Sequence, residues 1–304
     1  MPYPDRMGMA IIKQIIASRM TRDGLVETGI KGVRLFRATE AVPCAPAVYE
    51  PCVIAIVSGN KETVLDGQRH VYDNARYLCC PMSLPVEAGT PDASPETPLL
   101  GVYVALDPAL MRELSIAMEA VQGHVAATQG SARGIRLARW DDGFLDALLR
   151  VVQLGDSATD IAVLGDARLR ELYYAILKGE AGGFARRAFG PGNAIARSIA
   201  HVSSNLDQSV SIDDLAARAG MSRAAFHRRF KEATTLSPIQ FVKSMRLNNA
   251  AMKIAAGMTV AEAAHEVGYV SASQFSREFK RLYGRSPRQW SAGMMPSSNP
   301  LQPG

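Results

Sequence analysis

One pattern of residues occurs twice near the C-terminus, and it constrains the fold more than any other feature. Residues 224–241 and residues 273–290 carry the same order of aromatic, basic and Ser-Pro positions, displaced by 49 residues. Phe226 in the first copy, for example, corresponds to Phe275 in the second. Two copies are too few for a repeat array that stacks into a solenoid. We therefore expect two similar small units.

Each copy, with the residues before it, has the pattern of a helix-turn-helix. In the first copy, Ser211 can cap a helix that Gly220 ends, and Ser222 can cap a second helix. In the second copy, Gly268 and Ser271 hold the matching positions, with one extra residue in the turn. A glycine-containing turn between two short helices is typical of the DNA-reading motif.

The basic residues of the chain are concentrated in the same region. Residues 194–304 contain 14 Lys and Arg against 7 Asp and Glu, whereas residues 1–193 contain 20 against 22. This asymmetry indicates a nucleic-acid-binding surface; the alternative is a solvated basic face on an ordinary helical bundle. The second helices of the units carry donors suited to phosphates and base edges, and the candidate DNA-contacting residues are Arg223, Ala224, His227, Arg228, Lys231, Ser273, Gln274, Ser276, Arg277, Lys280 and Arg281.

Residues 194–294 resemble the DNA-binding domain of AraC/XylS-family transcription regulators, in which one long helix joins two helix-turn-helix units. The resemblance is carried by residues 246–250, 268–280 and 284–290. Thr235 departs from the family pattern, which usually has glycine there. A residue with a side chain in a left-handed turn costs about 1 kcal/mol.

The connecting helix, expected over residues 238–256, is apolar on more than one side and so should be buried on both. It would hold the two units about one helical turn of DNA apart, so that one chain binds an asymmetric site on double-stranded DNA. By position in the family motif, Lys231, Lys280 and Arg281 should lie towards phosphates. The residues expected to face base edges are Ala224, His227, Arg228, Ser273, Gln274 and Arg277.

The N-terminal part begins with an amphipathic helix over residues 9–20. It is not expected to be a signal peptide, because Lys13 and Gln14 interrupt the apolar run. No stretch approaches the roughly 20 apolar residues of a transmembrane helix. We therefore expect a cytoplasmic protein with no membrane partner.

Residues 25–106 change to short strand patterns bounded by proline and glycine, including a hairpin at Asp66-Gly67. Closely spaced short strands favour a small barrel or sandwich, and helical patterns follow over residues 107–180. The expected domains are a sensing and dimerisation domain at 1–185, a linker at 186–193, the DNA-binding domain at 194–294 and a disordered tail at 295–304.

Residues 49–61, 72–86 and 106–110 are similar to the N-terminal domain of one AraC-type subgroup, a cupin-like barrel followed by helices. The resemblance implies an α+β fold in which a small β-barrel with helices is joined to an all-α C-terminal domain. It also implies a small-molecule effector and contact with RNA polymerase, with helices available for a homodimer. Activation is expected, but the sequence leaves repression open as the alternative. Candidate effector-binding residues are Tyr49, Cys52, Cys79 and Cys80.

The sequence contains few features of a metal-binding protein or an enzyme. His70 is the single histidine of the strand region and has no paired histidine, so we expect no metal site. The sequence has no Walker loop, Rossmann glycine run or nucleophile elbow. We therefore expect neither an enzyme nor a cofactor.

The four cysteines leave two interpretations open. In the first, all four are small apolar strand residues. In the second, Cys79 and Cys80 form a thiol sensor, because strand alternation should turn one of them inward and the other outward. A thiol-based redox or electrophile sensor is thus the alternative to our hypothesis of an effector-binding regulator. An unregulated architectural DNA binder is a third class, but it would need no barrel.

Overall fold

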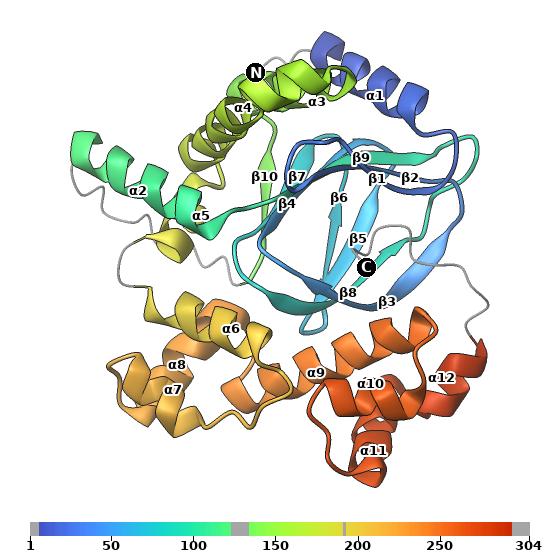
Figure 1. The fold of residues 1–304 in the computed structure, drawn as a ribbon, viewed down its shortest axis with the longest axis vertical. Coiled ribbons are helices and arrows are strands. Elements are labelled where there is room, and N and C mark those ends of the chain that lie inside the picture. Colours follow the sequence, from blue (N-terminus) through green and yellow to red (C-terminus); the bar gives the residue numbers. More distant parts are fainter. Residues whose placement is uncertain (1–5, 123–133, 191–192, 294–304) are drawn as a thin grey trace.

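The strands of the N-terminal half form two antiparallel sheets that face each other as a barrel (Figure 1). The computed structural model describes residues 6–122, 134–190 and 193–293. The strand order is β1-β2-β9-β4-β7-β10 in one sheet and β3-β8-β5-β6 in the other. The strands are β1 (Gly24–Glu27), β2 (Val33–Ala38), β3 (Val42–Tyr49), β4 (Cys52–Ser58), β5 (Lys61–Leu65), β6 (Gln68–Tyr72), β7 (Arg76–Cys80), β8 (Leu84–Thr90), β9 (Leu99–Ala105) and β10 (Arg136–Arg139).

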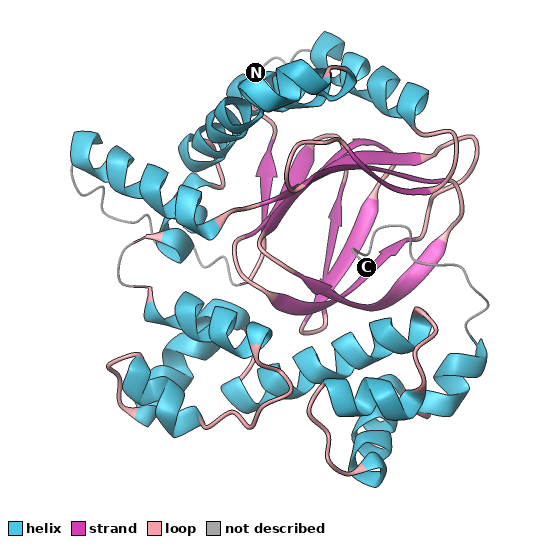
Figure 2. Cartoon of the chain, viewed as in Figure 1, coloured by secondary structure: helices cyan, strands magenta, loops and turns pink. Residues whose placement is uncertain are grey.

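Helices flank the barrel on two sides (Figure 2). In the N-terminal half they are α1 (Arg6–Arg19), α2 (Pro108–Gln122), α3 (Asp142–Gln153), the 3-10 helix η1 (Leu154–Asp156), α4 (Ala158–Lys178) and α5 (Gly182–Phe189). In the C-terminal part they are α6 (Ala194–Ser204), α7 (Ile212–Arg218), α8 (Arg223–Thr234), α9 (Pro238–Ala255), α10 (Val260–Glu266), α11 (Ala272–Tyr283) and α12 (Pro287–Gly293). Helix α1 packs on the six-stranded sheet, and α9 packs on β3 and β8 of the other.

The expected barrel is present, but the sequence did not reveal four of its strands: β1, β3, β8 and β10. Strand β3 contains Pro43 and Pro46 and has a bulge between Val42 and Ala45, and β8 contains Pro85. Proline cannot donate a ladder hydrogen bond, so these segments do not look like strands. Strand β3 lies at an edge of its sheet, where a missing donor is tolerated.

The predicted hairpin at Asp66-Gly67 joins β5 to β6. Asp66 has a φ of 49° and Gly67 a φ of 75°. Positive φ at both central residues is the backbone of the type I′ turn that matches the twist of the flanking strands. The two-residue hairpin is confirmed.

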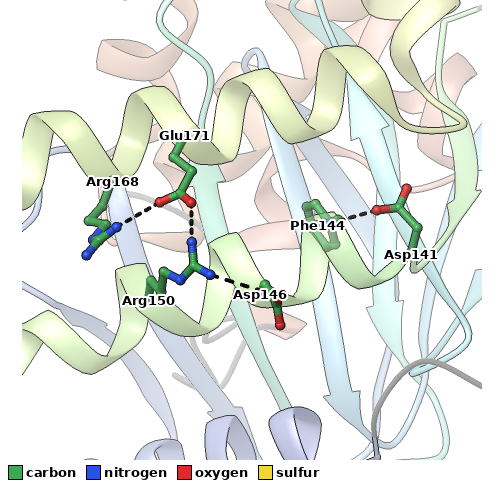
Figure 3. Close-up of polar contacts among 6 residues, drawn as sticks. All are labelled: Asp141, Phe144, Asp146, Arg150, Arg168 and Glu171. Atoms are coloured by element: carbon green, nitrogen blue, oxygen red, sulfur yellow. Dashed lines mark hydrogen bonds and ion pairs between the residues drawn. The ribbon is translucent and has the colours of Figure 1, made fainter.

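Helices α3 and α4 form a layer on the barrel. The ring of Phe144 in α3 stacks on Tyr77 of β7, with centroids 4.1 Å apart. Glu171 of α4 accepts from Arg168 at 3.0 Å and from Arg150 of α3 (Figure 3). The apolar contact thus fixes α3 to the sheet, while the carboxylate ties α4 to α3.

The expected linker at 186–193 is corrected in part, because α5 (Gly182–Phe189) extends into it. The glycines of this segment suggested a loop, but Phe184 and its helical neighbours are buried, and this apolar contact stabilises the helix. Residues 191–192 and the tail at 295–304 lie outside the described residues.

The C-terminal helices form two units joined by α9. We call α6–α8 the first unit and α10–α12 the second unit. Both lie on the side of the barrel opposite α1 and α3 (Figure 1). The expected long connecting helix at 238–256 is α9, with buried residues Phe241 and Met245 towards the first unit and Leu247, Ala251 and Ile254 towards the second.

Candidate DNA-binding surface and effector site

The first unit has the predicted helix-turn-helix construction. The Ser211 hydroxyl accepts from the backbone N–H of Asp214 at 3.2 Å, and the Ser222 hydroxyl accepts from Ala225 at 3.3 Å, so each serine caps its helix. Gly220 lies between the helices with a φ of 66°. Because the turn needs a left-handed residue, glycine fits there without strain.

The second unit repeats this construction with different caps. Thr259 and Glu262 form a capping box at the start of α10, Gly268 has a φ of 84°, and Ser271 accepts from the N–H of Gln274 at 3.2 Å. Thr259 was not among the N-caps predicted from the sequence, although the threonine-to-glutamate spacing is typical of a capping box. Both second helices, α8 and α11, are 12 residues long.

The two second helices expose most of the predicted DNA-contacting side chains. His227 and Ser276 are half-buried. The exposed residues are Arg223, Ala224, Arg228 and Lys231 on α8, and Ser273, Gln274, Arg277, Lys280 and Arg281 on α11. Each helix therefore presents a polar, largely basic face, while its aromatic residues point to the core.

Two of these side chains already have partners within the protein. The Arg223 guanidinium lies 3.0 Å from the carboxylate of Asp213. The Gln274 amide donates to Glu278 at 3.3 Å, and Glu278 also accepts from Lys243 at 3.3 Å. These contacts orient the Arg223 and Gln274 side chains. Each contact must be replaced by a contact with DNA if that side chain is to bind DNA.

Thr235 and Gly284 hold equivalent places at the ends of α8 and α11. Their φ angles are 72° and 73°, so both C-caps are left-handed. The predicted strain at Thr235 is therefore present. Its neighbour Thr234 helps to hold the turn, because its hydroxyl donates to the carbonyl of Phe230 at 2.9 Å.

Asn248 in α9 connects the second unit to the barrel. Its side-chain amide donates to the carbonyls of Ala47 in β3 at 2.7 Å and Val86 in β8 at 2.8 Å. Its oxygen accepts from the hydroxyl of Tyr283 at the end of α11, at 2.7 Å. Asn248 belongs to the family motif at residues 246–250, but this link to the barrel was not predicted from the sequence.

Three of the four predicted effector-binding residues meet inside the barrel. Cys52 of β4 lies opposite Cys80 of β7 in register. The Tyr49 hydroxyl lies 2.9 Å from the hydroxyl of Thr63 and 3.4 Å from that of Tyr72. All five residues are buried, so the space between the sheets contains a cluster of hydroxyl and thiol groups.

Cys79 and Cys80 point to opposite faces of β7, as strand alternation predicts. Cys80 faces the barrel interior and Cys79 faces away from it, and both side chains are fully buried. The neighbouring Tyr77, on the same face as Cys79, packs on Phe144 of α3, so helices cover this side. Burial raises the pKa of the Cys79 thiol to about 12 and raises the pKa of the Cys80 thiol as well.

Lys61 is a barrel residue that sequence analysis missed. It begins β5 and has the same side-chain direction as Thr63, into the barrel, with 2% of its surface exposed. Its ammonium nitrogen has no hydrogen-bond partner among the described residues. The strand was predicted to start one residue later; continuing its alternation backwards would have placed Lys61 inside.

Within the described ranges, no group of three or more His, Cys, Asp or Glu side chains could hold a metal ion. In the same ranges no helix is both long enough and apolar enough to cross a membrane. The geometry thus offers an exposed pair of basic helices and a buried polar cluster in the barrel.

Comparison with known proteins identifies both halves of the chain. The family model of the AraC-type transcriptional regulator N-terminus matches residues 29–184, and a helix-turn-helix domain model matches residues 215–293. The HTH-type transcriptional regulator MtrA of Neisseria gonorrhoeae is 42% identical over 80 residues, which cover 26% of this chain and 27% of MtrA. Regulatory protein SoxS of Escherichia coli (strain K12) is 30% identical over 93 residues, or 30% of this chain and 87% of SoxS.

The whole architecture also occurs in a solved structure. ToxT from Vibrio cholerae superposes with a TM-score of 0.56 at 11% sequence identity, covering 86% of this chain and 98% of ToxT. At that identity the likeness shows the fold alone. Because the N-terminal family accounts for just over half of the residues, the chain belongs to the AraC-type transcriptional regulators.

Proposed function

We propose that this protein is a sequence-specific DNA-binding transcription regulator that reads DNA with α8 and α11. The observation that carries the proposal is the pair of matched helices with exposed polar faces, joined by the single helix α9. Such a pair fits successive major grooves on one face of the duplex. Because the units are linked covalently but differ in sequence, one chain reads an asymmetric site.

A footprint with the full chain tests this function. We expect one asymmetric protected site with two contact patches about 10 base pairs apart. The triple variant Arg228→Ala, Arg277→Ala, Lys280→Ala should lose the footprint, whereas Arg150→Ala, on the distant helix α3, should keep it. A palindromic site that requires two chains would contradict the proposed reading.

Regulation by a small effector in the barrel is the second part of the proposal. Its support is the buried cluster around Tyr49, Cys52 and Cys80, beside strands on which α9 packs. One solved structure of ToxT is described as bound to an unsaturated fatty acid, and this supports the proposal of a small-molecule effector. Thermal melting against a metabolite panel, followed by DNA binding with each hit, tests the effector role.

The thiol-sensor alternative gains no support from the cysteine environments. A reactive cysteine needs access and a lowered pKa, whereas Cys52, Cys79 and Cys80 are buried and burial raises the pKa of each thiol. We therefore expect non-covalent effector binding. Replacing Cys79 and Cys80 together by alanine should preserve induction of the target gene; a folded double variant without any response would favour the thiol sensor.

Assembly and polymerase contact complete the proposed function. Helices α2 and α4 border a groove of roughly 510 Å³ beside the exposed apolar residues Val121, Val163 and Tyr174. Such a patch is typical of a protein interface, and we propose that it serves a homodimer. Sedimentation of Val163→Asp should then show a monomer where the wild type shows a dimer, and transcription with purified RNA polymerase tests activation.

A further inference from the structure

The barrel interior holds one ionisable group that the proposed function does not yet use. Lys61 is 2% exposed, and its side-chain nitrogen has no hydrogen-bond partner among the described residues. Burying an unpaired ammonium group is costly, and an apolar side chain of the same length would avoid the cost. Packing alone therefore does not account for a lysine at this position.

The groups that face Lys61 supply no negative charge at neutral pH. Tyr72 pairs with it on β6, and the thiols of Cys44 in β3 and Cys52 in β4 lie close enough to influence its pKa. Burial raises the pKa of Cys44 to about 11 and raises those of Cys52 and Tyr72, so all three stay protonated. The adjacent Glu62 is committed to a salt bridge with Arg69 at 2.5 Å.

Burial also changes the acid–base state of the lysine itself. It lowers the pKa of Lys61 to about 7, so near neutral pH the amine is at the point of gaining or losing a proton. A carboxylate placed beside it would raise that pKa, and the amine would take up a proton to form a buried ion pair. The free protein is therefore poised to accept an anion.

The hydroxyl cluster next to Lys61 can complete such a site. Thr63 follows two residues along β5 on the same face, and its hydroxyl lies 2.9 Å from Tyr49 and 3.4 Å from Tyr72. These hydroxyls can rotate to donate to a second carboxylate oxygen. We propose that the effector is a small organic carboxylate with an apolar body, and that Lys61 is its counter-ion inside the barrel.

The proposal rests on the proposed effector-responsive function and connects it to the DNA-binding domain. Thr63 pairs with Ala88 of β8, and two residues earlier on β8 the Val86 carbonyl accepts from Asn248 of α9 at 2.8 Å. An ion pair formed at β5 thus lies one strand away from the link to the second unit. Effector binding can reach α9 through a single sheet.

Matched acid and amide probes test the ligand class on the full chain. The probes are hexanoate with hexanamide, and cyclohexanecarboxylate with its carboxamide, at millimolar concentrations. We expect at least one carboxylate to raise the melting temperature of the wild type and of the exposed-lysine control Lys31→Met, and its amide to do so far less. Lys61→Met should fold and lose the response, whereas Lys61→Arg, which keeps the charge, should retain part of it.

Calorimetry adds a measurement that does not depend on a variant. Above pH 7 the free amine is largely neutral, so carboxylate binding should take up nearly one proton, and affinity should fall about tenfold per pH unit. Binding in two buffers of different ionisation enthalpy reports the proton. Lys61→Met should show neither effect.

Three results would overturn the inference. They are equal binding of acid and amide, undiminished carboxylate binding by Lys61→Met, and no binding of any carboxylate probe. If a neutral metabolite still shifts melting and DNA affinity, the effector-responsive function stands and only the role of Lys61 fails. If no small molecule shifts the melting temperature or the DNA affinity, the proposed effector-responsive function fails together with the role of Lys61.

Discussion

The first and second units share one chain trace but are attached to the rest of the molecule in different ways. The buried core of the first unit, which includes Phe226, Phe230 and Ile199, is continuous with the core of the barrel and its helices. The second unit has a separate core around Phe275 and Phe279. Apolar packing therefore fixes the first unit to the N-terminal domain, and it does not do so for the second.

Polar contacts take the place of apolar packing at the second unit. Asn248, 5% exposed, links Tyr283 to the carbonyls of β3 and β8. Separating the first unit from the barrel would expose apolar surface. For the second unit, the direct contacts with the barrel among the described residues are mainly hydrogen bonds, which can be exchanged for bonds to water. Displacing the second unit from the barrel should therefore cost less free energy than displacing the first.

The largest expected effect separates the two turn glycines. A Cβ on Gly268 would lie 2.7 Å from the carbonyl oxygens of Leu206 and Asp207, whereas a Cβ on Gly220 would meet nothing within 4 Å. Both have positive φ. Gly268→Ala should therefore lower the free energy of unfolding by about 3 kcal/mol or more, and Gly220→Ala by about 1 kcal/mol. Urea unfolding measures both, and equal losses would contradict the steric argument.

The second prediction removes the polar link. Asn248→Ala leaves two buried carbonyls and the Tyr283 hydroxyl without this partner, which should cost about 2–3 kcal/mol. Hydrogen exchange should become faster in the second unit and stay unchanged in the first. Asn249→Ala is the matched control, because among the described residues the Asn249 amide donates to Met245 of the same helix, at 2.8 Å. Faster exchange in both units would show that Asn248 does not distinguish them.

The third prediction concerns how α11 reads DNA. Arg277→Ala should cost about 1–3 kcal/mol of binding and relax the preference at one or two base pairs. Lys280→Ala should weaken all sequences about equally and reduce the slope of the salt dependence by roughly one. Fluorescence anisotropy with the footprinted site and single-base variants measures both. A uniform loss in both variants would refute the assignment of Arg277 to a base edge.

The smallest effect tests the left-handed caps. Thr235→Gly should stabilise the first unit by about 0.5–1 kcal/mol, because glycine relieves the strain at a φ of 72°. Gly284→Ala should destabilise the second unit by about 1 kcal/mol, since its φ of 73° is equally left-handed. Thermal unfolding measures the two changes, and the same sign for both would mean that the caps are not equivalent.

Local patterns predicted the DNA-binding half well. Helix caps and turns involve residues that are close in the sequence, so they can be predicted from it. The examples here are Ser211, Ser222, Gly220 and Gly268. The exposure of Arg228 and Arg277 follows from helical periodicity alone. Whether those side chains contact bases stays a prediction, because it depends on a bound duplex.

The barrel was harder to predict because strand pairing is not local. Prolines made β3 and β8 hard to recognise; the two segments become strands by pairing with each other and, for β8, with β5 as well. Alternation predicted that Cys79 and Cys80 point to opposite faces, but not which one points inward or that both are buried. The burial of Lys61 could not be predicted for the same reason, because it results from strands β4 and β6 lying around the side chain.

The sequence by itself determined the duplicated unit, its caps and turns, and the basic face of each second helix. These features depend on periodicity, charge and backbone preference over short distances. The tertiary structure alone decided that the first unit shares a core with the barrel, that Asn248 holds the second, and that Lys61 is buried without a partner. Those outcomes depend on which segments, far apart in the chain, pack together and exclude water from the surfaces between them. No short stretch of sequence specifies which segments pack together.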